Sequence, residues 1–156
     1  MQHLKQRVSL DAVSESYIKE ALHTYQSGCN KATAVMIGIA AEGMILHLRD
    51  ALVAKLYAAK KKVDKDLEGW RIKAVCDEVA VVLDANQKYM PQDLSAMYET
   101  YWSGFTSHIR AIRNKSGHPN SIDPVSNESV HSAMLIFSDF AKLTTDLEKW
   151  VATHSF

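Results

Sequence analysis

Arg113-Asn114-Lys115-Ser116-Gly117-His118-Pro119 divides the second half of the chain into two helices. Gly117 can adopt the left-handed conformation that closes a helix, and Pro119 pushes the residue before it into an extended conformation. Arg113 is therefore expected in the last helical turn and His118 just beyond the stop. Five helical residues span about 7.5 Å, so guanidinium and imidazole can meet at one anion. A permanent cation beside a group that titrates near neutrality suits phosphodiester chemistry.

Helix termination by itself explains most of the same stretch. Cations favour the C-terminal end of a helix, glycine commonly follows the last turn, and proline commonly comes next. Asn114 and His118 are explained less well in this way. An arginine and a histidine separated by four residues form a short pattern that arises by chance, so its context must decide between the two interpretations.

Outward from this stop, apolar spacing and helix breakers predict helices along the whole chain. Ser9 and Asn30 are suitable N-caps, Gly28 is a stop, and Pro91 lies where a helix can begin. The strand-like run 79–83 has no partner strand or hairpin signal, so it is also expected to be helical. The expected helices cover residues 10–27, 31–62, 67–88, 91–116 and 127 to about 150. The fold class is therefore all-α, an antiparallel bundle of about five helices in a single domain, 1–156.

Composition limits the possible functions. The chain has 18 basic and 18 acidic residues and a formal net charge of zero, so any contact with nucleic acid must depend on a local patch. The two cysteines lack a metal-ligand spacing, and the N-terminus lacks the apolar core of a signal peptide. The most apolar stretch, 32–48, contains Glu42 and His47, and we interpret it as a buried helix. A cytoplasmic location without membrane contact is the expectation.

Glu42 is an acid on an apolar stripe. At 100° per residue it lies in line with Val35, Ile39 and Leu46, so it needs a partner or a raised pKa. A basic group from another helix would serve, and Arg113 or Arg110 is the candidate. Alternatively, Glu42 lies at the edge of the stripe and reaches water. Small residues nearby would let another helix approach closely; they are Gly38, Ala40, Ala41 and Gly43.

No motif in the chain indicates a metal or a cofactor. The histidines form no pair spaced for zinc, and the chain has neither a glycine-rich phosphate loop nor a nucleophile elbow. His108 precedes Arg113 by about one and a half turns and can line the same cleft, although a surface position is the simpler expectation.

The arginine–histidine motif at this helix junction, together with Ala32–Leu46 and the helix that opens at 125–128, resembles the HEPN superfamily (higher eukaryotes and prokaryotes nucleotide-binding domains). The similarity extends over residues 15–152. HEPN domains are all-α bundles in which a polar residue, often asparagine, follows the arginine. Two departures stand out: Gly38 and Ile39 occupy the region where relatives often carry an arginine, and Asn120 stands where many toxin-type members have a tyrosine.

The resemblance implies a metal-independent endoribonuclease, in a toxin or phage-defence context, that leaves a 2′,3′-cyclic phosphate. His118 would be the general acid or base, and Arg113 would stabilise the phosphorane. Asn114 would position these groups by hydrogen bonds, and Glu42 would orient Arg113 or His118.

Family members usually form two-fold dimers that bring two motifs together. Such a dimer would gather Arg110, Arg113 and Lys115 from both copies around one RNA cleft. An antitoxin or another protein partner is possible in the same context. The alternative function is a non-catalytic module that binds a nucleotide or assembles with a protein.

Overall fold

The described part of the chain, residues 8, 10–117 and 124–156 of a computed structural model, consists of five α-helices and one short 3₁₀ helix and has no strand. In order these are α2 (Ala12–Gln26), α3 (Asn30–Ala58), α4 (Ile72–Asn86), η1 (Gln87–Tyr89), α5 (Gln92–Gly117) and α6 (Asn127–Thr153). The all-α helical bundle expected from the sequence is confirmed.

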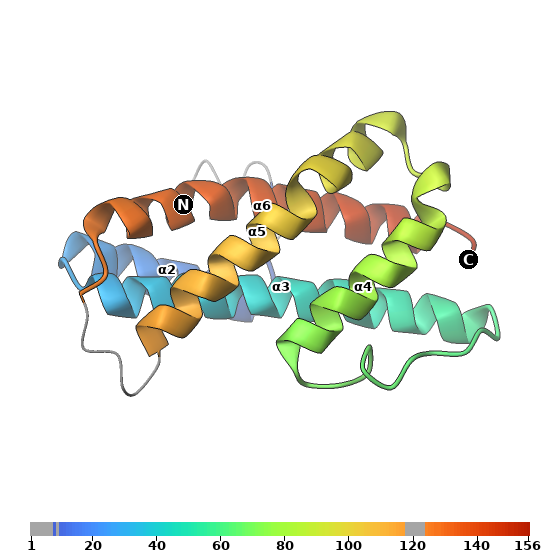
Figure 1. Cartoon of the computed structure of the whole chain (residues 1–156), viewed down its shortest axis with the longest axis horizontal. Coiled ribbons are helices and arrows are strands. Elements are labelled where there is room, and N and C mark those ends of the chain that lie inside the picture. Colours follow the sequence, from blue (N-terminus) through green and yellow to red (C-terminus); the bar gives the residue numbers. More distant parts are fainter. Residues whose placement is uncertain (1–7, 9, 118–123) are drawn as a thin grey trace.

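Helix α3 is the centre of the bundle. It packs against α2, α5 and α6 and less extensively against α4 (Figure 1). Leu48 and Leu52 are fully buried within the core around it. By length and composition α3 could also cross a membrane, and 50% of its most apolar window is buried inside the bundle.

Helix directions in the bundle are mixed. Gly28, with φ of 71°, turns the chain so that α2 and α3 run antiparallel. α5 crosses α3 and α6 in the opposite direction (Figure 1). α3 and α6 run in the same direction, as two hydrogen bonds show. Asn30 Nδ2 donates to the Val125 carbonyl (3.0 Å) near the starts of the two helices, and Lys55 Nζ donates to the Ala152 carbonyl (2.6 Å) near their ends.

Two predicted N-caps are wrong. Asp11 caps α2 in place of Ser9, because its carboxylate accepts from the Val13 and Ser14 amides. Ser9 itself lies outside the described residues. Asn30 is the first residue of α3 and not its cap, since its side chain bonds to the start of α6. The predicted starts of α5 after Pro91 and of α6 at Asn127 are confirmed.

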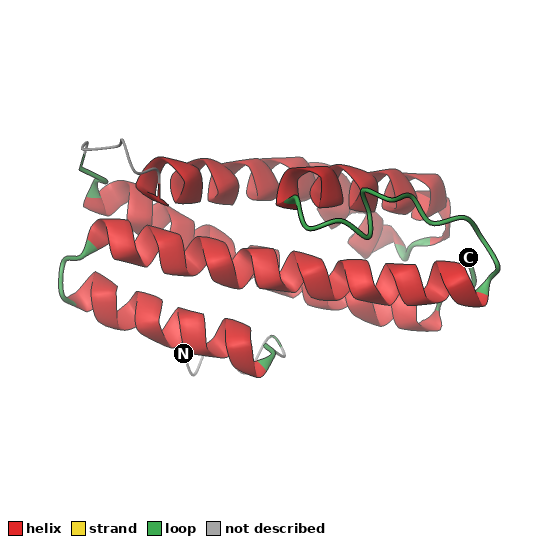
Figure 2. Ribbon diagram, turned by 90° about the horizontal axis from the view of Figure 1, so that it is seen from below, coloured by secondary structure: helices red, strands yellow, loops and turns green. Residues whose placement is uncertain are grey.

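The connection between α3 and α4 is longer than predicted. α3 ends at 58 instead of 62, where Lys60 takes a φ of 55°. α4 begins at 72 instead of 67, because Leu67 is 1% exposed and anchors the connection to the core as a loop residue. The loop 59–71 runs back along the bundle before α4 starts (Figure 2).

Candidate functional site

Arg113 lies where α5 crosses α3, against the backbone of Gly38. A Cβ atom at Gly38 would be 2.4 Å from Arg113 Cγ and 2.5 Å from Arg113 Cβ. Such contacts are far inside van der Waals range, so a glycine is required here for the two helices to approach. The first carbons of the Arg113 side chain thus rest on the α3 helix, which fixes the direction in which the guanidinium leaves α5.

The guanidinium of Arg113 is held from two sides. One turn after Gly38, Glu42 Oε1 lies 3.5 Å from Arg113 Nε, and Arg113 Nη1 donates to Asn114 Oδ1 at 3.3 Å. The Glu42 side chain is 19% exposed and that of Arg113 is 40% exposed. Of the two interpretations left open for Glu42, the structure shows the basic partner from another helix: Arg113, and not Arg110, forms the ion pair, while the carboxylate side chain stays partly exposed.

Arg110 lies three residues before Arg113 on α5. Burial raises the pKa of the Cys76 thiol to about 11; the positive charge of Arg110 opposes that rise, and the negative charges of Asp77 and Glu42 add to it. Arg110 Nε is buried without a hydrogen-bond partner, and Arg110 forms no ion pair within the part of the chain that the structure describes. One side of α5 therefore carries two guanidiniums, of which one is paired with a carboxylate.

Two further predicted site residues, His108 and Lys115, do not join this group. At 100° per residue, His108 lies about 140° around α5 from Arg113, and Lys115 lies about 200° around it. His108 Nε2 is buried without a hydrogen-bond partner, so the half-buried ring is not the simple surface histidine considered above. Lys115 is exposed. His118 lies outside the described residues.

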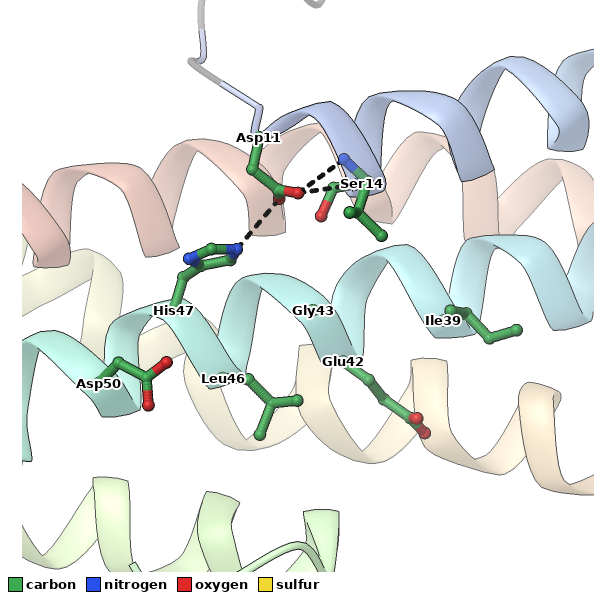
Figure 3. A pocket seen from close by; sticks show the side chains of 9 residues that line it. Asp11, Ser14, Ile39, Glu42, Gly43, Leu46, His47 and Asp50 are labelled. Atoms are coloured by element: carbon green, nitrogen blue, oxygen red, sulfur yellow. Dashed lines mark hydrogen bonds and ion pairs between the residues drawn. The ribbon is translucent and has the colours of Figure 1, made fainter. Parts of the chain in front are cut away.

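Glu42 also borders a cavity of about 290 Å³ between α2 and α3, which the sequence reasoning missed (Figure 3). His47 Nε2 lies 3.5 Å from Asp11 Oδ2 at one end of this cavity, whereas Glu42 points away from that pair (Figure 3). Burial acts to raise the pKa of Asp11, but hydrogen bonds from Ser14 and Val13 and the charge of His47 hold it below its ordinary value. The sequence held one indication of this cavity: Asp11 is of a residue type that caps helices, and it stands just before the first apolar turn of α2.

No group of three or more His, Cys, Asp or Glu side chains that could hold a metal ion occurs among residues 8, 10–117 and 124–156. Comparisons with protein-family models, with curated proteins and with solved structures found no match to the chain.

Proposed function

We propose that the chain is an endoribonuclease of the HEPN type, which cleaves RNA without a metal and leaves a 2′,3′-cyclic phosphate. One observation carries the proposal: the Arg113 guanidinium is held in place by Gly38, Glu42 and Asn114. An arginine that is positioned before substrate arrives loses little conformational freedom when it binds a phosphate. His118 follows five residues later in the sequence.

The proposed reaction is an attack of the ribose 2′-hydroxyl oxygen on the adjacent phosphorus. The bond from phosphorus to O2′ forms, and the bond to the 5′-oxygen of the next nucleotide breaks. A base takes the proton of the 2′-hydroxyl, and an acid donates a proton to the departing 5′-oxygen. Arg113 would stabilise the added negative charge on the phosphorane through charge-assisted hydrogen bonds.

A two-fold dimer supplies what one chain lacks. Each copy has one His118, whereas the reaction needs an acid and a base, so the two copies of His118 would share these roles. Two copies each of Arg110 and Arg113 would also concentrate positive charge in one cleft. Such a cleft could attract RNA although the whole chain has a formal net charge of zero, because the phosphates would lie next to the arginines.

A second candidate function is nucleotide binding without cleavage. It is favoured by the ion pair between Glu42 and Arg113, because a carboxylate so close to the guanidinium offsets part of the charge that a phosphorane would need. In this case Arg113, with Glu42 and Asn114 beside it, would bind a phosphate group, and His118 would not be essential.

Cleavage of a single-stranded RNA with a fluorophore at one end and a quencher at the other, in buffer containing EDTA, distinguishes the two functions. We expect wild type to cleave it and both Arg113→Ala and His118→Ala to lower the rate by about 100-fold or more. His23→Ala is the matched control, because that histidine side chain is 76% exposed on α2. RNA carrying 2′-O-methyl groups should remain intact, since its nucleophile is blocked.

Equal cleavage by wild type and His118→Ala would contradict the ribonuclease proposal and indicate a contaminating nuclease. Binding of the methylated RNA by wild type, weakened in Arg113→Ala, with no cleavage of the unmodified RNA, would instead establish the second function. Circular dichroism should show that every variant remains helical.

A further inference from the structure

Arg110 is a half-buried cation on α5. Its Nε atom is buried and has no hydrogen-bond partner. No ion pair involves Arg110 within residues 8, 10–117 and 124–156. A charged donor that is removed from water and bonds to nothing is costly, so this state of the guanidinium favours an acceptor that comes from a bound ligand.

The neighbours of Arg110 on its own helix are not acidic. Side chains three and four positions apart on a helix are the ones that meet. For Arg110 these neighbours are Thr106, Ser107, Arg113 and Asn114. Among these four only Arg113 is charged, and an anion that lies between two guanidiniums is attracted by both.

The two arginines differ in how much of their charge is already neutralised. Glu42 Oε1 lies 3.5 Å from Arg113 Nε, and Arg113 Nη1 also donates to Asn114 Oδ1 at 3.3 Å. Arg110 has no such partners in the part of the chain that the structure describes. Because the Glu42 carboxylate offsets the charge of Arg113, a phosphodiester with one negative charge is attracted mainly by Arg110 when it first binds.

The balance between the two arginines changes when the ribose 2′-oxygen attacks. The attack adds negative charge to the phosphate, so the paired guanidinium of Arg113 interacts more strongly with the phosphorane than with the bound substrate. Interactions that strengthen in the transition state raise kcat, whereas interactions that are equal in both states only lower KM. The unpaired arginine and the paired arginine are therefore suited to different steps.

We propose that Arg110 holds a phosphate of the bound RNA through charge-assisted hydrogen bonds, and that Arg113 acts mainly on the phosphorane. The inference rests on the proposed ribonuclease function, because it divides the work within the same site. Arg110 is a binding residue in this division, and no bond forms or breaks at its atoms.

The binding role of Arg110 is tested with a fluorescein-labelled octauridine whose 2′-hydroxyls are methylated, so that no cleavage occurs. Fluorescence anisotropy over a series of salt concentrations gives Kd and its salt dependence. We expect Arg110→Gln to weaken binding by about 5- to 20-fold. The slope of log affinity against log salt should become shallower by about 0.7, the share of one phosphate contact in a single strand. Lys149→Gln is the matched control, because it removes the same charge from a 70% exposed side chain on α6.

The role of Arg113 is tested with the double variant Glu42→Gln and Arg113→Gln, which removes both charges of the ion pair together. A single substitution of Arg113 would leave Glu42 unpaired beside the RNA and repel it. We expect the double variant to lose cleavage of unmodified RNA by about 100-fold or more and to keep the salt slope of wild type. Arg110→Gln should instead raise KM by the same factor as Kd and change kcat by less than about 2-fold.

The inference is wrong if Arg110→Gln and wild type bind the methylated RNA with equal affinity and slope, or if wild type does not bind it. It is also wrong if the double variant loses more of the salt slope than Arg110→Gln does. Wild type that binds through Arg110 but cleaves nothing would refute the ribonuclease proposal and leave the binding role of Arg110 intact. Cleavage that depends on Arg113 and His118, with binding that is independent of Arg110, would do the reverse.

A purely structural role for Arg110 predicts a different result. We expect Arg110→Gln to unfold at the same urea concentration as wild type or at a higher one, because the substitution removes a buried donor without a partner. A lower urea midpoint together with an unchanged salt slope would show a structural role and overturn the inference. Arg110→Lys keeps the charge and should keep the salt slope, so a slope lost in this variant would overturn the inference even if Arg110→Gln failed to fold.

Discussion

The Arg113 side chain rests on the backbone of Gly38, with its Cβ 2.5 Å from the point where a side chain at residue 38 would begin. This relationship joins α3 to α5 and directs the guanidinium toward Glu42. The absence of a side chain at residue 38 is therefore what lets the Arg113 side chain occupy this position.

Gly38→Ala should destabilise the protein by up to about 2 kcal/mol. Overpacking costs about 1–3 kcal/mol, which exceeds the gain of about 1 kcal/mol from replacing a helical glycine by alanine. The crowded Arg113 atoms adjoin the backbone, so they cannot move aside without shifting α5. Urea unfolding monitored by circular dichroism measures the change.

Gly104→Ala is the matched control for this substitution. Gly104 lies inside α5, and a Cβ there would meet nothing within 4 Å. The free energy of unfolding of this variant should rise by about 0.5–1 kcal/mol from helix propensity alone. If Gly38→Ala gained the same amount, the close approach of the two helices would be disproved.

The ion pair between Glu42 and Arg113 should contribute a coupling free energy of about 0.5–1 kcal/mol, because both side chains remain partly exposed. A double-mutant cycle with Glu42→Gln and Arg113→Gln measures it by urea unfolding. The coupling should shrink in 1 M salt, where charges are screened within about 3 Å. The exposed pair Lys73–Asp77 is the comparison and should couple by about 0.3–0.5 kcal/mol. A coupling of zero would mean that Glu42 does not orient the guanidinium.

The two cysteines should differ sharply in reactivity. Both are free thiols, with Cys29 exposed and Cys76 buried. Burial raises the pKa of Cys76 to about 11, and thiolates are the reactive form. Brief iodoacetamide treatment at pH 8 should therefore add one label by mass spectrometry, and Cys29→Ser should add none. Rapid double labelling of native protein would contradict the buried position of Cys76.

The carboxylates near His47 should give stability changes of opposite sign with pH. The pKa of Asp11 lies below its ordinary 3.8 in the folded state. Its contribution to stability is therefore complete above pH 3.8 and is lost as the pH falls through the folded pKa. Asparagine also caps helices, so Asp11→Asn removes the charge and keeps the cap. The variant should be less stable than wild type at pH 7, and this difference in stability should shrink as the pH falls below 3.8.

Glu148 on α6 should behave in the reverse way. Burial raises its pKa above the ordinary 4.5, and Asp11 raises it further while His47 lowers it. Wild type loses stability as the pH rises from 4.5 through the raised pKa of the folded state, because burial disfavours the charged carboxylate. Glu148→Gln should thus be more stable than wild type at pH 7 and equal to it well below pH 4.5. Urea unfolding across the pH series checks both carboxylates, and a Glu148→Gln variant that is less stable at pH 7 would refute the assignment.

Lys60→Gly should stabilise the protein by up to about 1 kcal/mol. Lys60 has a φ of 55° just after α3, a conformation that costs a residue with a side chain roughly 1 kcal/mol and glycine almost nothing. Thermal unfolding of Lys60→Gly against Lys61→Gly makes the comparison. A loss of stability in Lys60→Gly alone would show that the lysine side chain matters more than its backbone.

Local pattern was sufficient for much of this fold. The turn at Gly28, the start of α5 after Pro91 and the start of α6 at Asn127 follow from breakers and caps that act over a few residues. Apolar periodicity was enough for the all-α class. An acid on an apolar stripe also indicated that a cation from another helix could pair with Glu42, although the pattern left an edge position in water equally open.

Tertiary packing decided what depends on distant parts of the chain. Whether Arg110 or Arg113 forms the ion pair with Glu42 is set by the crossing of α5 over Gly38, which brings Arg113 to the carboxylate. The loop 59–71 exists because Leu67 is drawn into the core and Arg49 bonds to its backbone. These contacts join residues far apart in the sequence, so their energies cannot be assigned until the helices have been placed.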